Sequence, residues 1–305
     1  MPRWLRRTLI ALGTVVAIGA LAYWYFVGDG APPATLPAFS LDMDAVRAKA
    51  EELPGGKATD IRVEIIAGFD FPAVAAVGGD GWNINKMGAF SFQVILPTDT
   101  VIIDTAFNAA MGGSLGAKID DDAYARMDVA MADATQIIVT HEHPDHIGGI
   151  IAYPEPNAIL KQLRLNKEQV ESLPRYSLAL PDELTGIVPI DYSGMLAIAP
   201  GIVLIHSPGH TPGSQLVYVK RADGKELLFV GDIAWTARNI DTAKGRPRLL
   251  SAFMLKEDRD MVFAELKTLQ ALHAADPGLF MVPGHDVSAI DALVTAGAMA
   301  KGFRP

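Results

Sequence analysis

Residues 136–146 read Gln-Ile-Ile-Val-Thr-His-Glu-His-Pro-Asp-His, an apolar run followed at once by three imidazoles and the Asp145 carboxylate. The run Gln136–Thr140 predicts a strand, and the cluster His141–His146 begins where that strand ends. The chain has only seven histidines, so a polar loop would rarely hold three of them by chance. Imidazoles and carboxylates are zinc ligands, and we interpret the stretch as half of a metal site.

The sequence contains no cysteine. Any zinc ion must therefore be held by His and Asp side chains, which excludes thiolate structural sites, Cys nucleophiles and disulfides together. An open site of the hydrolytic type is the expected alternative. The lack of cysteine is compatible with an oxidising compartment without requiring one.

Residues 1–27 are predicted to form a cytoplasmic tip and a transmembrane anchor or signal segment. Thr8–Val27 is an uncharged apolar run of 20 residues, close to the length that crosses the hydrocarbon core of a bilayer. Three arginines precede this run, and the next basic residue after it is Arg47. The positive-inside rule then places the N-terminus in the cytoplasm and the rest of the chain outside, in the periplasm or the extracellular space.

A cleaved signal peptide is the alternative, because Ala20-Leu21-Ala22 resembles a small-residue cleavage site. The apolar run continues to Val27, beyond that site, which favours an uncleaved single-pass anchor. Both interpretations export the remaining chain. Residues 28–59 are predicted to be a tether and lead-in, with a Pro/Gly/Ala-rich start over 28–37, and residues 60–305 the catalytic domain.

The net charge of −9 argues against a nucleic-acid partner, because phosphate binding requires clustered Lys and Arg. One dense basic patch follows the anchor, formed by Lys244, Arg246 and Arg248. We expect it to be a solvated loop, although an anionic substrate could bind there. A small molecule is the expected partner, and the oligomeric state stays open.

Short strand-like runs alternate with helical ones from about residue 60. The expected strands are Ile61–Ala67, Ser91–Leu96, Val101–Asp104, Gln136–Thr140, Ile202–His206, Gln215–Val219, Glu226–Val230 and Leu279–Val282. Helices are expected over Asp121–Ala132 and from an N-cap at Asp258 to about Ala275. The polar candidates fall where strands end, as functional groups do in layered α/β proteins.

Three further metal donors occupy such positions. His210 lies in the Gly/Pro-rich loop 207–213, Asp232 follows the strand that ends at Val230, and His285 follows the last strand. We assign structural roles to His206, which lies within a strand, and to His273, which lies on a helix without nearby donors.

The ordered set His141-x-His143-x-Asp145-His146, His210, Gly231-Asp232 and His285, with Asp104 ending an early strand, resembles the metallo-β-lactamase-fold hydrolase superfamily. The resemblance spans about residues 60–290. It implies an α/β protein with a four-layer αββα sandwich, here preceded by one N-terminal transmembrane helix. It also implies that His141, His143 and His210 hold one metal, that Asp145, His146 and His285 hold another, and that Asp232 bridges the two.

Two Zn²⁺ ions, or other divalent metals, suit this donor set, since two ions about 3.5–4 Å apart can share a hydroxide that attacks a carbonyl. Asp145 is the expected catalytic residue, which orients the hydroxide and carries its proton to the leaving group. Asp104 is expected to hold the ligand loop in place without binding metal.

The local motifs resemble those of acyl-homoserine lactonases, in residues 207–215, in Asp232-Ile233-Ala234-Trp235 with Asn239, and in Gly284-His285-Asp286. The bridging Asp232 distinguishes the chain from true metallo-β-lactamases. In the lactonases a tyrosine that stabilises the oxyanion stands three residues after the bridging Asp, and here that residue is Trp235. Trp235 is interpreted either as a wall of the substrate pocket or as a packed aromatic beneath the site.

The leading hypothesis is an exported binuclear zinc hydrolase that opens a lactone or ester. The alternatives are a thioesterase of the glyoxalase II type, which needs a cationic surface for its substrate, and a membrane-tethered domain that binds a metal or ligand without catalysis. Loss of a ligand would signal the non-catalytic alternative, and none is missing. Iron in place of zinc would point to oxidation on the same fold.

Overall fold

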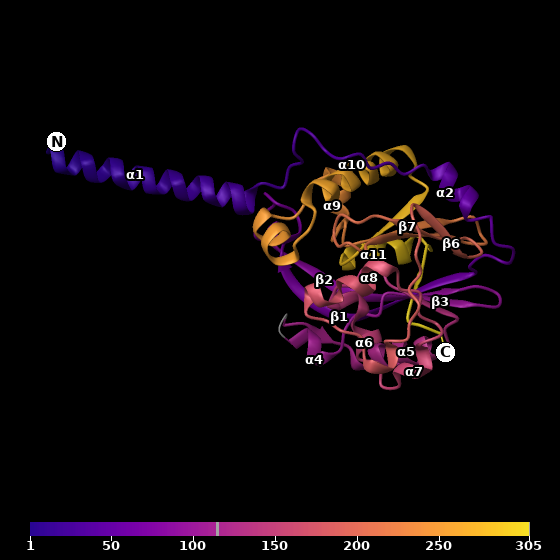
Figure 1. The fold of residues 1–305 in the computed structure, drawn as a ribbon. Coiled ribbons are helices and arrows are strands. Elements are labelled where there is room, and N and C mark those ends of the chain that lie inside the picture. Colours follow the sequence, from indigo (N-terminus) through magenta and orange to yellow (C-terminus); the bar gives the residue numbers. More distant parts are fainter. Residues whose placement is uncertain (114–115, 305) are drawn as a thin grey trace.

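Two β-sheets pack face to face, and helices cover the outer face of each sheet (Figure 1). The structure is a computed structural model that describes residues 1–113 and 116–304. The first sheet has the strand order β11-β1-β2-β3-β5, with β4 paired to β1, and the second has the order β10-β9-β8-β7-β6. The predicted αββα sandwich is confirmed.

The first sheet consists of β1 (Asp60–Pro72), β2 (Ile84–Ile95), β3 (Thr100–Ile103), β4 (Lys118–Ile119), β5 (Gln136–Ile138) and β11 (Ala300–Lys301). The second consists of β6 (Met195–Ala199), β7 (Ile202–His206), β8 (Gln215–Lys220), β9 (Glu226–Gly231) and β10 (Leu279–Pro283).

The α-helices of the described residues are α1 (Arg3–Tyr23), α2 (Met43–Lys49), α3 (Ala73–Ala76), α4 (Ala109–Gly112), α5 (Asp121–Asp133), α6 (Pro144–Ile151), α7 (Pro156–Ile159), α8 (Lys167–Ser172), α9 (Ala237–Thr242), α10 (Arg259–Ala275) and α11 (Val287–Thr295). Short 3-10 and π segments are η1 (Trp24–Gly28), η3 (Leu173–Tyr176), η4 (Asp182–Leu184) and η5 (Leu249–Leu255).

The strands that carry the site are short, apolar and buried on both faces. β3 pairs with β5 in parallel, with Val101 opposite Gln136 and Ile103 opposite Ile138. Side chains of such strands contact the core on one side and the outer helices on the other, so their sequences are continuous apolar runs. Because the two strands are parallel, the residues after Ile103 and after Ile138 leave the sheet at the same edge.

Three apolar clusters hold the layers together. One lies between the sheets, where the rings of Phe92 and Phe229 meet edge to face with centroids 4.9 Å apart. A second packs α5 and α6 against the first sheet, and a third packs α2 and α10 against the second. The metal-donor loops therefore lie on a scaffold that is packed on every side.

The predicted boundaries are wrong in two places. β1 and β2 extend well beyond the predicted runs and pair from Asp60 opposite Ile95 to Pro72 opposite Ile84. The added part contains Gly, Asp, Asn and Lys, which hide the alternating pattern although the backbone ladder continues. β3 and β5 end one and two residues early, because Asp104 turns to φ 59° and the Thr140 N–H donates to the Asp104 side chain instead of to a neighbouring strand.

Other local predictions are confirmed. Asp258 caps α10 by accepting a hydrogen bond from the Met261 N–H at 3.0 Å. Gly224 adopts φ 87° in the turn between β8 and β9, a left-handed conformation that favours glycine.

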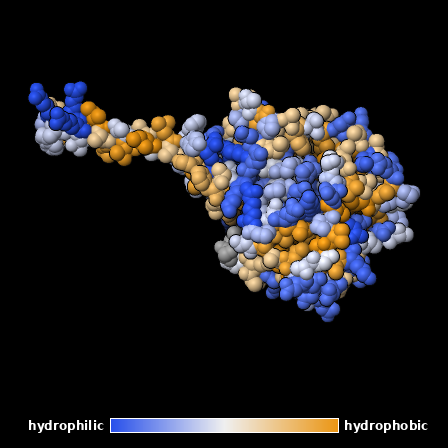
Figure 2. Space-filling view, viewed as in Figure 1, coloured by the Kyte–Doolittle hydropathy of each residue, from blue (hydrophilic) through white to orange (hydrophobic). Residues whose placement is uncertain are grey.

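α1 projects from the sandwich as a single helix (Figure 1). Residues Arg3–Gly28 have the length and composition of a membrane span, with a mean hydropathy of 1.9, and none of the apolar window is buried. A signal sequence has the same properties. Figure 2 shows a hydrophilic tip at the N-terminus followed by the apolar stretch.

Phe229→Ala is expected to lower the free energy of unfolding by about 3–5 kcal/mol, because it removes a ring from the contact between the sheets and leaves a cavity. Denaturant unfolding measures the loss. Val129→Ala, on the exposed face of α5, is the control and should change stability by about 0.5 kcal/mol or less. A loss below about 1 kcal/mol for Phe229→Ala would show that the sheets do not depend on this contact.

Candidate metal centre

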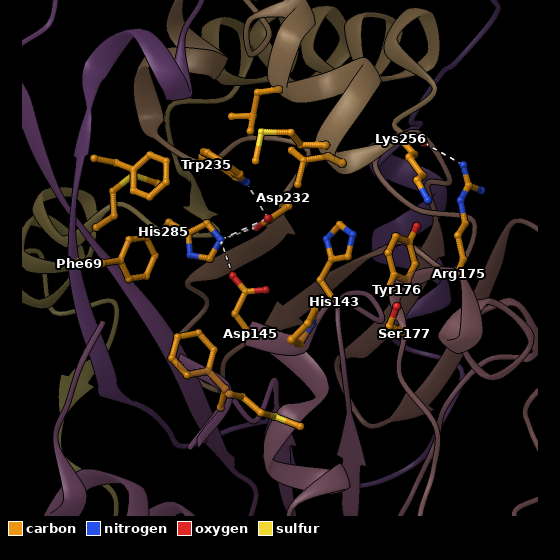
Figure 3. Close-up of a pocket in the computed structure, with 18 residues that line it drawn as sticks. Phe69, His143, Asp145, Arg175, Tyr176, Ser177, Asp232, Trp235, Lys256 and His285 are labelled. Atoms are coloured by element: carbon orange, nitrogen blue, oxygen red, sulfur yellow. Dashed lines mark hydrogen bonds and ion pairs between the residues drawn. The ribbon is translucent and has the colours of Figure 1, made fainter. Parts of the chain in front are cut away.

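The seven predicted metal donors converge at one edge of the sandwich. His141 and His143 follow β5, Asp145 and His146 lie in the first turn of α6, and His210 lies in the loop between β7 and β8. Asp232 follows β9, and His285 follows β10. Figure 3 shows four of these side chains, His143, Asp145, Asp232 and His285, pointing into a common space.

One group of donors gathers beside Asp232 Oδ2. His210 Nε2 lies 3.5 Å and His141 Nε2 3.8 Å from this oxygen. His143 turns its Nδ1 toward the same point, 2.9 Å from His210 Nε2 and 3.1 Å from His141 Nε2. Three imidazoles and one carboxylate oxygen therefore face a volume of the size that one ion needs.

A second group gathers beside Asp232 Oδ1. His285 Nε2 lies 3.1 Å and His146 Nε2 3.3 Å from this oxygen. Asp145 contributes Oδ2 at 3.5 Å from His285 Nε2 and Oδ1 at 4.0 Å from His146 Nε2. His285 Nε2 is also 3.2 Å from Asp232 Oδ2, so its contact with Asp145 assigns it to this group. Asp232 thus presents one oxygen to each group.

Oxygen acceptors orient three of the imidazoles from behind. The Nδ1 atoms of His146, His285 and His210 lie 2.9 Å from Asp104 Oδ2, 2.8 Å from the Gly88 carbonyl and 2.6 Å from Glu257 Oε1. A carboxylate or a carbonyl can only accept, so each Nδ1 carries a hydrogen and each Nε2 is left to face the centre. This pattern is typical of metal-binding histidines.

Asp104 also shapes the loop that carries the first four donors. Its Oδ1 accepts from the Thr140 N–H at 2.6 Å, and its Oδ2 accepts from the Thr140 hydroxyl at 2.9 Å. Asp104 therefore contacts the start of the donor loop and one of its histidines, and its positioning role stays a prediction.

The electrostatics of the centre favour bound cations. Burial lowers the pKa of His141 and His143 well below the usual value, so both rings are neutral and can donate a lone pair. Burial also opposes a charge on His146, yet the carboxylates of Asp104 and Asp232 outweigh it and raise its pKa well above the usual value. His146 Nε2 and Asp232 Oδ1 are buried without a hydrogen bond. Divalent ions would satisfy both atoms, so the residues fit a metal centre.

Sequence reasoning missed the groups behind His210. Glu257 is fully buried and contacts both His210 and the guanidinium of Arg246. The Arg246 side chain is 1% exposed and lies over the Trp235 ring, 4.9 Å from its centroid. The prediction that Arg246 belongs to a solvated loop is therefore wrong, because its charge is paired inside the protein. Neither residue has a motif, and only the fold brings them together.

Among the described residues, neither His206 nor His273 belongs to a group of potential metal donors. His206 is half-buried on β7 beside Tyr192, and His273 is exposed on α10.

A pocket of about 470 Å³ opens onto the centre. Its walls are largely apolar, and one side carries Arg175, Tyr176 and Lys256 (Figure 3). The Tyr176 ring meets the His143 ring edge to face at 4.4 Å, and its hydroxyl is buried without a hydrogen-bond partner. Tyr176 was not predicted, since nothing in the sequence around residue 176 marks it.

Trp235 lies both in the pocket wall and in aromatic packing beside the centre, the two positions predicted from the sequence. It lines the pocket, and it packs edge to face on His285 with ring centroids 5.7 Å apart. Its indole N–H donates to Asp232 Oδ2 at 2.6 Å. The tryptophan therefore orients the carboxylate that stands between the two donor groups, a contact that neither prediction included.

The family model of the metallo-beta-lactamase superfamily matches residues 88–301. The chain belongs to this superfamily, as its motifs and fold indicate.

Curated relatives match over a shorter stretch. An N-acyl homoserine lactonase from a Bacillus species is 29% identical over 109 residues, which is 36% of this chain and 42% of the lactonase. A hydroxyacylglutathione hydrolase from Pseudomonas paraeruginosa is 34% identical over 107 residues, or 34% of each chain. The chain therefore matches less than half the length of these relatives.

Solved structures agree on the fold. A quorum-quenching N-acyl homoserine lactone lactonase superimposes with a TM-score of 0.61 at 14% identity, covering 78% of this chain and 97% of that one. A probable metal-dependent hydrolase from Staphylococcus aureus gives 0.59 at 14% identity, covering 77% and 91%. At this identity the likeness shows a shared fold.

Trp235→Phe is expected to weaken metal binding about 10–100-fold, because it keeps most of the packing but removes the hydrogen bond to Asp232. Competition with a chromophoric chelator measures the affinity. Trp82→Phe changes an exposed tryptophan and should bind metal as the unmodified protein does. Equal affinities for the two variants would leave Trp235 with a packing role alone.

Glu265→Gln tests a buried acid that holds the His210 loop. Glu265 Oε1 accepts from the Ser207 hydroxyl at 2.8 Å and from the Gly209 N–H at 3.1 Å, and burial raises the pKa of Glu265 to about 8. At a pH between 4.5, the pKa of this carboxyl in the unfolded chain, and about 8, its pKa in the folded protein, Glu265 is protonated when folded and ionised when unfolded. Rising pH in this range therefore favours the unfolded chain.

The Glu265→Gln variant has no ionisable group at this position. Its stability relative to the unmodified protein is therefore expected to rise from pH 5 to pH 8, by at most about 1.4 kcal/mol per pH unit. Denaturant unfolding at several pH values measures the slope, which is independent of any constant cost of the amide. A difference in stability that stays constant with pH would contradict the buried, protonated state.

Proposed function

We propose that this chain is an exported hydrolase that uses two divalent metal ions, most simply zinc, to cleave the bond between the acyl carbon and the leaving oxygen of a small lactone or ester. The observation that carries the proposal is the position of Asp232, whose two oxygens face two separate groups of donors. The first metal would be held by His141, His143 and His210, the second by Asp145, His146 and His285, with Asp232 between them. When bound, such ions polarise a carbonyl and lower the pKa of water.

Asp145 is the proposed proton carrier. It is the donor residue of this centre whose side chain is the most open to the pocket, at 21% exposed. Its carboxylate can accept a proton from a water molecule in the centre and deliver it to the leaving oxygen of the substrate. The remaining donors are buried, and partners outside the donor set orient His146, His210, His285 and Asp232, which suits binding.

Tyr176 is the proposed donor to the substrate oxygen. Burial raises its pKa to about 12, so the phenol stays protonated at neutral pH. Its unpartnered hydroxyl can donate a hydrogen bond to the oxygen on which charge develops. The Trp235 N–H is already bound to Asp232, so Trp235 cannot take this role without releasing that carboxylate.

The distribution of basic residues around the N-terminal apolar segment supports export of the enzyme. In this proposal residues 1–27 form the anchor or signal segment, residues 28–59 the lead-in and residues 60–305 the hydrolase domain, placed in the periplasm or the extracellular space. The argument is that three arginines lie in the first turns of α1, ahead of its apolar part, and that the next basic residue is Arg47.

A thioesterase is the second candidate. The Lys244/Arg246/Arg248 patch does not support it, because Arg246 is buried and paired with Glu257. Arg175 and Lys256 instead place two cationic side chains at the pocket, where an anionic thiol conjugate could bind. A binding domain without catalysis is disfavoured, because all seven donors of the two groups are present and converge.

The zinc-loaded protein should hydrolyse lactones or aryl esters in a screen that also contains thioesters, β-lactams and phosphodiesters. His143→Ala and Asp232→Ala should each abolish turnover, since each removes a donor at the centre, while circular dichroism reports a folded protein with less bound metal. His273→Ala changes an exposed histidine outside the centre and is the matched control. Near-normal turnover in either donor variant would refute the two-metal proposal.

A further inference from the structure

Exposed apolar side chains gather on one side of the domain. Among the described residues after Gly28, eight large apolar side chains are exposed, and five belong to two segments beside the end of α1. These five are Trp82, Ile84, Leu249, Phe253 and Met254, and we call them the Trp82/Phe253 surface. Clustering of this kind marks an interaction site, whereas scattered apolar residues do not.

The surface adjoins the N-terminal helix directly. The Trp82 indole N–H donates to the Tyr23 hydroxyl at 3.1 Å. The rings of Phe26 and Phe253 lie 6.1 Å apart, and the Arg248 guanidinium stacks on Tyr25 at 4.5 Å. The apolar side chains of α1 and η1 therefore continue onto the domain without an intervening polar spacer. In Figure 1, η5 is the orange coil beside the inner end of α1.

The chain leaving α1 is bound to the domain, so this arrangement has a defined orientation. The Gly245 N–H donates to the Gly30 carbonyl at 3.0 Å, and Arg259 donates to the Asp29 carbonyl at 2.8 Å. A Cβ atom on Gly30 would lie 2.4 Å from the Gly78 carbonyl oxygen, so only glycine fits. The first residues after α1 are therefore packed against the domain. If α1 spans a bilayer, these contacts would hold the Trp82/Phe253 surface against that bilayer.

The segment η5 belongs both to this surface and to a wall of the pocket. Leu250, Met254 and Leu255 of η5 line the cavity above the metal centre, and Met254 belongs to both the cavity and the exposed surface. Arg248 and Lys256 flank η5 at its two ends. Lys256 is exposed, and a cationic side chain at the border of an apolar stretch suits the headgroup region, where its charge meets phosphate; Arg248 is instead paired with Asp29 at 3.4 Å.

We infer that the Trp82/Phe253 surface docks on the bilayer that holds α1, and that the pocket takes its substrate laterally from this bilayer. The substrate class is an amphiphile whose alkyl chain partitions into the membrane and whose ester or lactone carbonyl lies near the headgroups. The docking rests on membrane insertion of α1, and the substrate class rests on the proposed hydrolase function. A bilayer is favoured over a second copy of the chain because α1 itself leads into it.

The cysteine-free sequence makes docking directly testable. Single variants Leu249→Cys, Phe253→Cys and Val129→Cys of the full chain, each carrying a nitroxide, are reconstituted into phosphatidylcholine vesicles. Spin-label relaxation by oxygen, which concentrates in lipid, is compared with relaxation by a water-soluble nickel complex. Labels at 249 and 253 are expected to report lipid, and the label on α5 at 129 is expected to report water.

Two results would overturn the docking. Labels at 249 and 253 that report water like the label at 129 would show that the surface stays in solvent. Dipolar broadening between labels at 253 on different molecules would show that a second copy covers the surface instead.

Turnover separates docking from catalysis. The double variant Leu249→Asp/Phe253→Asp changes no pocket residue, and it should hydrolyse a long-chain ester in vesicles on the order of tenfold more slowly. It should leave the rate on a short soluble ester unchanged, as should the control Val129→Asp on both esters. Equal rates of the double variant and the unmodified protein on the vesicle ester would refute lateral entry. If the unmodified protein cleaves neither esters nor lactones, the proposed function fails, and the spin labels still decide the docking.

Discussion

The buried Asp232 carboxylate is the constraint on which the site depends. Both of its oxygens are enclosed, and imidazoles of His210 and His285 approach it from different sides. A buried charge is costly unless it is paired, so this arrangement requires positive charge in the centre. Trp235 holds the carboxylate in place through its indole N–H, and Arg246 lies over the same ring. The site and its supporting shell therefore form one packed unit.

The fold supplies that unit by ending several strands at one edge. β3 and β5 run in parallel, which brings Asp104 beside Thr140 and His146. β9 and β10 are also parallel, and they bring Asp232 and His285 together. Parallel pairing thus gathers side chains at one edge within each sheet, and the packing of the two sheets brings the donors of both sheets into one centre. The long β1–β2 ribbon adds the Gly88 carbonyl that orients His285.

The pocket lies close to the inner end of α1, so the proposed hydrolysis would take place near the membrane that holds this helix. η5 contacts the end of the N-terminal helix on one side and lines the cavity on the other. A hydrolase whose pocket wall is also its membrane-facing surface would meet substrates that a soluble relative meets only at low concentration. The same apolar wall would favour substrates with alkyl chains, because burying such a chain against apolar side chains is stabilised by the hydrophobic effect.

Much of the fold and all seven donors could be predicted from the sequence, because both depend on local patterns. Buried parallel strands are apolar runs, and metal donors are scarce residue types that follow those runs at recognisable spacings. The ends of β1 and β2 could not be predicted, since backbone pairing continues there without an alternating side-chain pattern. Glu257, Arg246 and Tyr176, and the bond from Trp235 to Asp232, were decided by tertiary structure alone, because burial and contact between distant segments determine a charge partner. The sequence by itself indicated which side chains could form the centre, because donor residue types and their spacing are local. Only tertiary structure decided which side chains line the pocket, because η5 and the residues around Tyr176 reach it from distant parts of the chain.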